Sequence, residues 1–257
     1  MKPINLETIN RSFDIQAPNF ESKSVQFCKE SYLQYMLSNI APKQDNTVLE
    51  VASGTCICSR FLAPHAQAVV CLDATTSMLK KGKCEAEKEH LHNMFFVKGY
   101  AEELPFLDNS FDIVFSRLAF HHFTDVYKVF SEMVRVLKPD GKLVFIDMEA
   151  TDEILRPIED ELETLRDSSH VRNLSITEMK KLFESYSLQI EKCEGTKIQQ
   201  QLSDWLNLTK TPKSKRDRII ALIKEELNGN EKTGLYPFKT DKGICFNHNW
   251  IFILGRK

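Results

Sequence analysis

Two segments of the 257-residue chain place groups that bind nucleosides at the ends of expected strands. Residues 48–55 run from an apolar stretch into Ala-Ser-Gly-Thr, where Gly54 lets a ligand approach the backbone and the following helix offers free N–H groups. Residues 69–73 end in Asp73, whose carboxylate can accept hydrogen bonds from two vicinal ribose hydroxyls. An acidic residue about 20 residues beyond such a turn is typical of nucleotide-binding folds.

Each of these segments also has a purely structural interpretation. Residues 48–55 can form a plain strand-to-helix turn, and Asp73 can cap the helix that begins at Thr75 or Thr76. The occurrence of both segments at this separation favours the ribose role for Asp73.

These residues need a sheet to bring them together, and apolar periodicity predicts one. We expect strands near residues 47–51, 68–72, 94–97, 112–116, 142–147, 188–193 and 246–254. Helices are expected near 57–62, 76–89 and 126–137, the last ending at the turn formed by residues 138–141. Strands that are apolar on both faces and alternate with helices predict a doubly wound α/β fold with a parallel sheet.

The flanking segments lack this alternation. Residues 1–44 predict a helical cap, with Phe20, Ser24, Phe27 and Met36 at helical spacing, and residues 45–150 form the ligand-binding core. Residues 151–240 are expected to be a helical lid that includes the sixth strand, and 241–257 carry the last strand. We see no linker, so one domain is expected.

Composition limits the partners. The formal net charge of −2 argues against a general nucleic-acid binder, and the apolar runs are too short for membrane insertion. The first seven residues show no secretion signal, and seven cysteines suggest reduced thiols. We therefore expect a cytoplasmic protein that is a monomer or a homodimer.

The close pair Cys56 and Cys58 invites a metal or arsenic hypothesis. A zinc site needs a second pair, which is missing, so we predict no metal and treat these thiols as small buried side chains. The basic residues in 210–218 can touch an anionic surface or simply form the solvated start of a helix.

Further motifs make the assignment specific. Residues 99–106 read Gly-Tyr-Ala-Glu-Glu-Leu-Pro-Phe, 108–114 read Asp-Asn-Ser-Phe-Asp-Ile-Val, 116–123 read Ser-Arg-Leu-Ala-Phe-His-His-Phe, and 137–143 read Leu-Lys-Pro-Asp-Gly-Lys-Leu. Over residues 45–150 the chain resembles the class I S-adenosylmethionine-dependent methyltransferases, in particular the branch with the ubiquinone/menaquinone C-methyltransferases. The resemblance implies a Rossmann-like, seven-stranded, mostly parallel sheet with an antiparallel last strand and a helical lid.

The resemblance also implies S-adenosylmethionine as the cofactor and assigns residues to it. The methionine part would lie beside Glu50, Ala52, Ser53 and Gly54, and the ribose beside Asp73 and Ala74. The adenine would be contacted by Met78, Tyr100, Ala101 and Glu102, and Ser116 and Arg117 would lie under the methyl-bearing sulfur.

The glycine loop departs from the family pattern. It reads Ala52-Ser53-Gly54-Thr55-Cys56 where Gly-x-Gly-x-Gly is usual, and Tyr100 replaces a common acidic residue. Alanine suits the first position if its φ stays negative, whereas a Cβ at Cys56 would crowd a left-handed conformation. The missing glycines count against a nicotinamide dehydrogenase, because a dinucleotide pyrophosphate needs several close backbone approaches.

The expected activity is transfer of a methyl group to a small-molecule acceptor by in-line displacement. His121 is the candidate base, unless it only packs within its loop; His122, His170 and Tyr236 are weaker candidates. Phe13, Phe20, Trp205, Tyr236 and Phe238 are candidates for lining the acceptor pocket. A cofactor-binding protein without transferase activity is the alternative.

Overall fold

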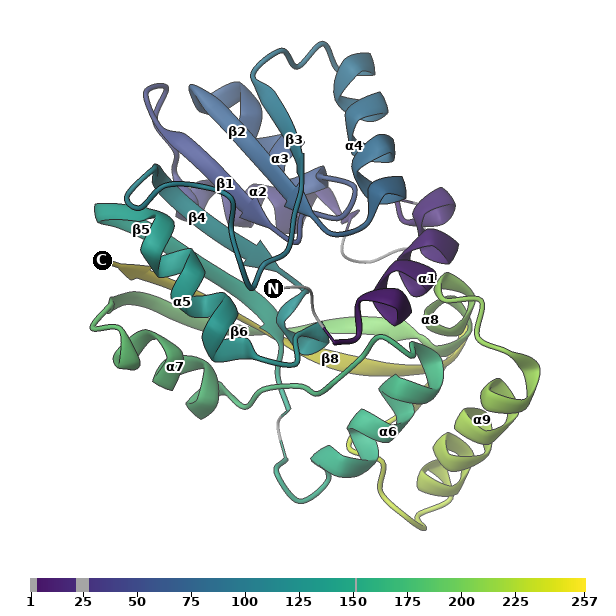
Figure 1. Ribbon diagram of the computed structural model, residues 1–257. Helices are drawn as coiled ribbons and strands as arrows, with labels where there is room; N and C mark the ends of the chain where they lie inside the picture. Colours follow the sequence, from purple (N-terminus) through teal and green to yellow (C-terminus); the bar gives the residue numbers. More distant parts are fainter. Residues whose placement is uncertain (1–3, 22–27, 151) are drawn as a thin grey trace.

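The computed structural model, which describes residues 4–21, 28–150 and 152–257, contains one twisted sheet wrapped by helices (Figure 1). The strand order is β3-β2-β1-β4-β5-β8-β6, and the short β7 pairs with β8 outside this path. The strands are β1 Thr47–Val51, β2 Ala68–Asp73, β3 Met94–Lys98, β4 Phe111–Arg117, β5 Leu137–Met148, β6 Gln189–Gln201, β7 Phe238–Thr240 and β8 Gly243–Arg256. The seven strands expected from the sequence are confirmed, and β7 adds an eighth.

The strand order reverses between β1 and β4, which pair in parallel with each other. Strands β1 to β5 form parallel pairs throughout, whereas β8 runs antiparallel to both β5 and β6. This is the doubly wound arrangement with an antiparallel last strand. In such sheets the carboxyl ends of the strands beside the reversal leave room for a ligand.

Helices cover both faces of the sheet and bury two separate apolar layers. Helices α2 (Glu30–Ile40), α3 (Ile57–Leu62) and α4 (Thr76–Lys88) pack on one face, where Met36, Leu62 and Val69 share a cluster. Helices α5 (Val126–Val136) and α7 (Ile176–Ser185) pack on the other, where Phe130 and Phe183 meet. Burial on both sides explains the consecutive apolar residues Val48 and Leu49 in β1 and Ile113–Phe115 in β4.

The carboxyl-terminal third builds a small core of its own beside the sheet. Helices α6 (Arg156–Arg166), α8 (Leu202–Leu208) and α9 (Lys213–Leu227) enclose Leu162, Trp205, Ile219 and Phe246. Strands β6 and β8 extend into this lid as far as the pair Gln201 and Cys245, which takes β6 well beyond its expected end at residue 193. The apolar pattern of the sequence did not predict the extension of β6, because residues 194–201 are mostly polar and exposed.

The amino-terminal segment is helical where the structure describes it. Helix α1 (Leu6–Gln16) and the 3-10 turn η1 (Ala17–Asn19) precede α2, which ends before Pro42. Ser24 and Phe27, which belonged to the expected helical pattern, lie outside the described residues. In Figure 1, α1 lies beside α4 and α8, next to the carboxyl ends of the parallel strands.

One predicted turn takes a different form. Residues 138–141 do not separate α5 from β5, because β5 already begins at Leu137. They form an irregularity within the strand, where the pairing with β4 jumps from Leu137 to Lys142 and Asp140 has a φ of 61°. Within the described ranges, no helix combines the length and apolar character needed to cross a membrane.

Candidate active site

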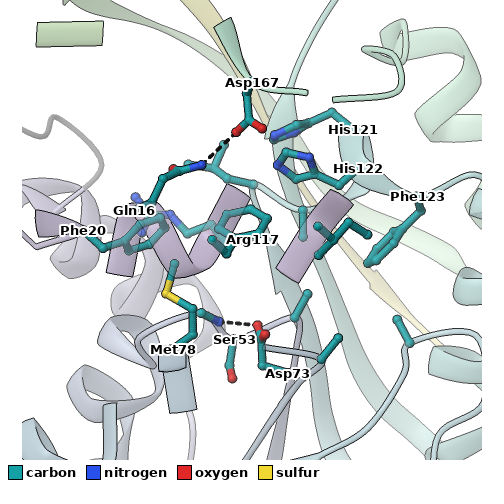
Figure 2. Close-up of a pocket in the computed structure, with 18 of the residues that line it drawn as sticks. Gln16, Phe20, Ser53, Asp73, Met78, Arg117, His121, His122, Phe123 and Asp167 are labelled. Atoms are coloured by element: carbon teal, nitrogen blue, oxygen red, sulfur yellow. Dashed lines mark hydrogen bonds between the residues drawn. The ribbon is translucent and has the colours of Figure 1, made fainter. Parts of the chain in front are cut away.

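A cavity lies at the carboxyl ends of β1, β2 and β4, under α1 (Figure 2). Of the residues that the sequence assigned to the site, twelve line this cavity: Glu50, Ala52, Ser53, Gly54, Asp73, Ala74, Met78, Tyr100, Ala101, Glu102, Arg117 and His121. Ser116 does not, because its hydroxyl donates to the carbonyl of Val51 inside the sheet. Figure 2 shows Asp73, Ser53 and Met78 at one end of the cavity and His121, His122 and Asp167 at the other.

The loop after β1 keeps the shape that glycines would give it. Ala52, Gly54 and Cys56 all have left-handed φ angles, of 57°, 53° and 59°. Ala52 therefore does not meet the condition of a negative φ under which alanine would suit this position, and the loop holds two residues with a Cβ in a strained conformation. A neighbouring glycine makes room for Cys56, because a Cβ on Gly82 of α4 would lie 2.8 Å from the Cys56 Sγ.

Asp73 joins this loop to the start of α4. Its Oδ2 accepts the Gly54 N–H at 2.7 Å, and its Oδ1 accepts the Thr75 N–H at 2.7 Å. Burial raises the pKa of the Asp73 carboxyl, although these backbone N–H groups oppose the shift. The contact with Thr75 resembles the capping role considered from the sequence, although Thr75 itself is the N-cap residue of α4.

Glu50 lies beneath the same loop and is buried. Its Oε2 accepts hydrogen bonds from both the backbone N–H and the hydroxyl of Ser59 at the start of α3. Burial raises the pKa of Glu50 to about 7, and the nearby Asp73 contributes to the shift. Glu50 therefore changes charge near neutral pH, close to where the loop would receive a ligand.

Met78 and residues 99–102 line the same end of the cavity as the loop after β1. Met78 is fully buried on α4, and Ala101 is almost so. Tyr100 forms a one-residue bridge with Glu103, which fixes the turn after β3. The Glu102 Oε1 atom is buried with no hydrogen-bond donor among the described residues, and burial raises the pKa of this carboxyl.

At the other end of the cavity, His121 pairs with Asp147 at the end of β5. The His121 Nδ1 lies 2.6 Å from the Asp147 Oδ1, and both side chains are buried. Asp147 also accepts the N–H groups of Phe120 and Met148. Burial alone would lower the pKa of His121, but the Asp147 carboxylate outweighs it and the pKa is raised.

His122 has the opposite electrostatic setting. Its Nδ1 lies 3.1 Å from the Ser169 hydroxyl, which donates its proton to Asp167. His122 Nδ1 must therefore be the donor in this contact, which leaves Nε2 unprotonated in the neutral ring. Burial, followed by the neighbouring His121, lowers the pKa of His122 to about 3.

Helix α1 is tied to both ends of the cavity. Gln16 Nε2 and Ser12 Oγ donate to Asp167, while Asn10 Oδ1 accepts from Thr75 Oγ1 near the start of α4. Ile9 and Phe13 of the same helix line the cavity. Helix α1 thus forms part of the cavity wall.

Some of the weaker candidates line the cavity and others lie outside it. Phe13, Phe20 and Trp205 line the cavity as expected, but Tyr236 and Phe238 do not. Tyr236 is 50% exposed, and Phe238 begins the short β7. His170 also stays outside the lining and pairs with Asp160 through Nε2 at 2.8 Å.

The Cys56 thiol contacts that of Cys71, and both belong to the same buried apolar cluster as Cys58. Cys56 contacts Ser53, whereas Cys58 accepts a hydrogen bond from Arg117. In the part of the chain that the structure describes, no three His, Cys, Asp or Glu side chains are placed to hold a metal ion. The basic residues near the start of α9 are mostly exposed.

The lining residues that the sequence analysis missed include the polar side chains of Gln16, Arg166, Asp167, Gln200, Asp204 and His248. The partner of His121, Asp147, was missed as well, although it ends an expected strand just as Asp73 does. That position was a usable signal, because ligands in such sheets meet the carboxyl ends of strands.

Comparison with known proteins agrees with this geometry. A family model described as a methyltransferase domain matches residues 49–145, which hold the loop, Asp73 and His121. The uncharacterized methyltransferase YcgJ of Bacillus subtilis is 32% identical over 195 residues, covering 76% of this chain and 77% of YcgJ. The chain belongs to the class I S-adenosylmethionine-dependent methyltransferases. The crystal structure of YcgJ superimposes on this methyltransferase with a TM-score of 0.81 and 30% identity, covering 89% of this chain and 99% of YcgJ.

Other relatives extend the family likeness. A demethylmenaquinone methyltransferase of Listeria welshimeri is 31% identical over 148 residues, which are 55% of this methyltransferase and 62% of the relative. Phosphoethanolamine N-methyltransferase 2 of Haemonchus contortus, solved with S-adenosyl-L-methionine, shares the fold with a TM-score of 0.66 at 20% identity. That likeness covers 98% of this methyltransferase and 59% of the Haemonchus chain. No comparison favours the alternative without transferase activity.

Proposed function

We propose that the cavity binds S-adenosylmethionine and that the protein transfers its methyl group to a small-molecule acceptor held under the lid. The observation that carries this proposal is the joining of Asp73 to the loop after β1, inside one cavity that also contains His121. When bound, S-adenosylmethionine supplies an activated methyl group on a sulfonium, so the protein mainly has to orient the two reactants and exclude water.

The lining residues suit the parts of this cofactor. Asp73 lies where a ribose would bind, with Ala74 beside it and Met78 on the apolar wall for an adenine. The orphaned acceptor on Glu102 suits an N–H donor, and Tyr100 and Ala101 complete that wall. Glu50, Ala52, Ser53 and Gly54 would contact the methionine part, and Arg117 lies between the two ends in Figure 2. Ser116 would act indirectly, by fixing the end of β4.

We assign the base to His121. Asp147 occupies its Nδ1, so Nε2 is the nitrogen left to take a proton from an acceptor. Asp147 then stabilises the imidazolium that forms. Because Asp147 raises the pKa of His121, the imidazole loses its proton at a higher pH than an ordinary histidine does. The free base becomes more abundant as the pH rises through this pKa, so turnover of an acceptor that must lose a proton should rise as well.

The test has two stages. Isothermal titration calorimetry with S-adenosylmethionine and S-adenosylhomocysteine measures binding of the cofactor and of its product. Incubation with methyl-labelled S-adenosylmethionine and a broad set of small molecules then detects transfer. We expect both binding and labelled product. A folded sample that binds neither nucleoside would exclude the proposal, whereas binding with no transfer to any acceptor would favour the non-catalytic alternative.

A further inference from the structure

Arg166, the last residue of α6, is fixed on two sides and still has donors to offer. Its Nε donates to the Glu163 Oε2 at 2.9 Å, and its guanidinium carbon lies 5.0 Å from the centre of the Trp205 ring. The other Glu163 oxygen lies 3.1 Å from His248 Nε2. Arg166 lines the cavity, and its two terminal nitrogens have no hydrogen-bond acceptor among the described residues.

The carboxylates around Arg166 already have donors. Glu163 is held by Arg166 and His248, Asp167 by Ser12, Gln16 and Ser169, and Asp147 by His121 and two backbone N–H groups. Burial would raise the pKa of Glu163, but Arg166 and His248 lower it well below its ordinary value, so the group is ionised. These acidic side chains therefore have little capacity left for a cationic ligand.

Apart from the Nε2 atoms of His121 and His122, the groups that remain open beside Arg166 are mainly donors. Besides the Arg166 terminal nitrogens, the indole N–H of Trp205 is buried with no acceptor among the described residues. Asp204 is a further acceptor: it lines the cavity from the first turn of α8, is only partly buried, and has no hydrogen-bond partner among the described residues. A ligand that supplies oxygen acceptors would satisfy the Arg166 terminal nitrogens and the Trp205 indole N–H.

We infer that Arg166 anchors an anionic oxygen group of the methyl acceptor, and that the acceptor is a carboxylate-bearing small molecule. This inference rests on the proposed function. An arginine whose fork is held by an ion pair and an aromatic ring can bind a planar carboxylate through two parallel hydrogen bonds. Arg166 and His121 line the same cavity, so an acceptor anchored at Arg166 shares that cavity with the assigned base.

The test compares matched probes on the complex with S-adenosylhomocysteine. The probes are phenylacetate, phenylacetamide and phenethylamine, and the indole series of indole-3-acetate, indole-3-acetamide and tryptamine. Ligand-observed NMR titration gives each dissociation constant. On at least one frame we expect the carboxylate to bind about tenfold more tightly than its amide and its amine.

The variant Arg166→Gln should abolish this preference without changing the affinity for S-adenosylhomocysteine. Arg218→Gln is the matched control, because Arg218 lies on α9 and forms an exposed pair with Glu161 outside the cavity. If Arg166→Gln fails to fold, the comparison within the native chain still decides whether carboxylates are preferred.

Three outcomes would overturn the inference: an amine preferred on both frames, which would assign selectivity to Asp204; no preference for either carboxylate; or a carboxylate preference that survives in folded Arg166→Gln. Absence of S-adenosylhomocysteine binding would instead count against the proposed function. The two failures are therefore distinguishable.

Discussion

The Asp73 carboxylate accepts the backbone N–H of Gly54 at 2.7 Å, which joins the end of β2 to the loop after β1. The two segments that point to a nucleoside in the sequence are thus directly bonded in the structure. Asp73 holds the shape of the loop and also lines the cavity where the ribose is proposed to bind.

Replacing Asp73 by alanine should weaken S-adenosylhomocysteine binding by about 1–3 kcal/mol, because ribose hydroxyls lose their acceptor and the Gly54 N–H loses its partner. Calorimetry measures the change. Asp125→Ala is the control: Asp125 caps α5 by accepting the Lys128 N–H and does not line the cavity. The Asp125→Ala variant should lower the stability of the protein without changing its affinity for S-adenosylhomocysteine. Equal nucleoside affinities for the two variants would leave Asp73 with only a structural role.

Ala52→Gly should stabilise the protein by about 1 kcal/mol, since glycine adopts a φ of 57° without the steric cost of a Cβ. Ala63→Gly makes the same chemical change at a φ of −54°, where it should destabilise by a similar amount. Urea unfolding of both variants measures the difference. A loss of stability in Ala52→Gly would mean that the loop gains more from the alanine methyl group than it loses in strain.

Glu50 should make the stability of the ligand-free protein fall as the pH rises. Its pKa is about 7 in the folded protein and near 4.5 when exposed, so between these values only the unfolded state releases the proton. The free energy of unfolding of Glu50→Gln, measured relative to that of the native chain, should therefore rise by about 1–3 kcal/mol from pH 5 to pH 8. Unfolding curves at both pH values test this, and an advantage independent of pH would contradict the buried, titrating carboxyl.

The two adjacent histidines should titrate far apart. Asp147 raises the pKa of His121, whereas His122 has a pKa of about 3 and stays neutral. Asp147→Asn should lower the His121 pKa. An NMR titration of the imidazole nitrogens measures this change. The pair with Asp147 stabilises the fold below the unfolded pKa of about 6.5, and this contribution is lost as the pH rises through the raised pKa.

Asp160→Asn is the matched control for this titration, because Asp160 pairs with His170 instead. It should leave the His121 pKa unchanged. If the pKa of His121 does not fall in Asp147→Asn, the assignment of Asp147 as the group that tunes the base is wrong.

The core of the site was predictable because its signals are local. Glu50 lies in β1, Gly54 follows β1 within a few residues, and Asp73 ends β2; the parallel order of these strands brings their ends to one edge. The same logic could have found Asp147, which is the last but one residue of β5.

The lid side was not predictable in this way. Arg166 belongs to no motif. Its partner Glu163 also contacts His248, which lies 85 positions further along the sequence. The left-handed φ of Ala52 was also missed, since alanine gives no sign of positive φ; the packing of the loop outweighs the local preference of the residue.

Helix α1 contributes Ile9, Phe13 and Gln16 to the cavity while its polar groups bond to Asp167 and Thr75. A nucleoside bound in the cavity would therefore lie against this helix. We therefore expect the amino-terminal helix to govern how long the product stays bound, so that residence time depends on a segment that contributes no strand to the sheet.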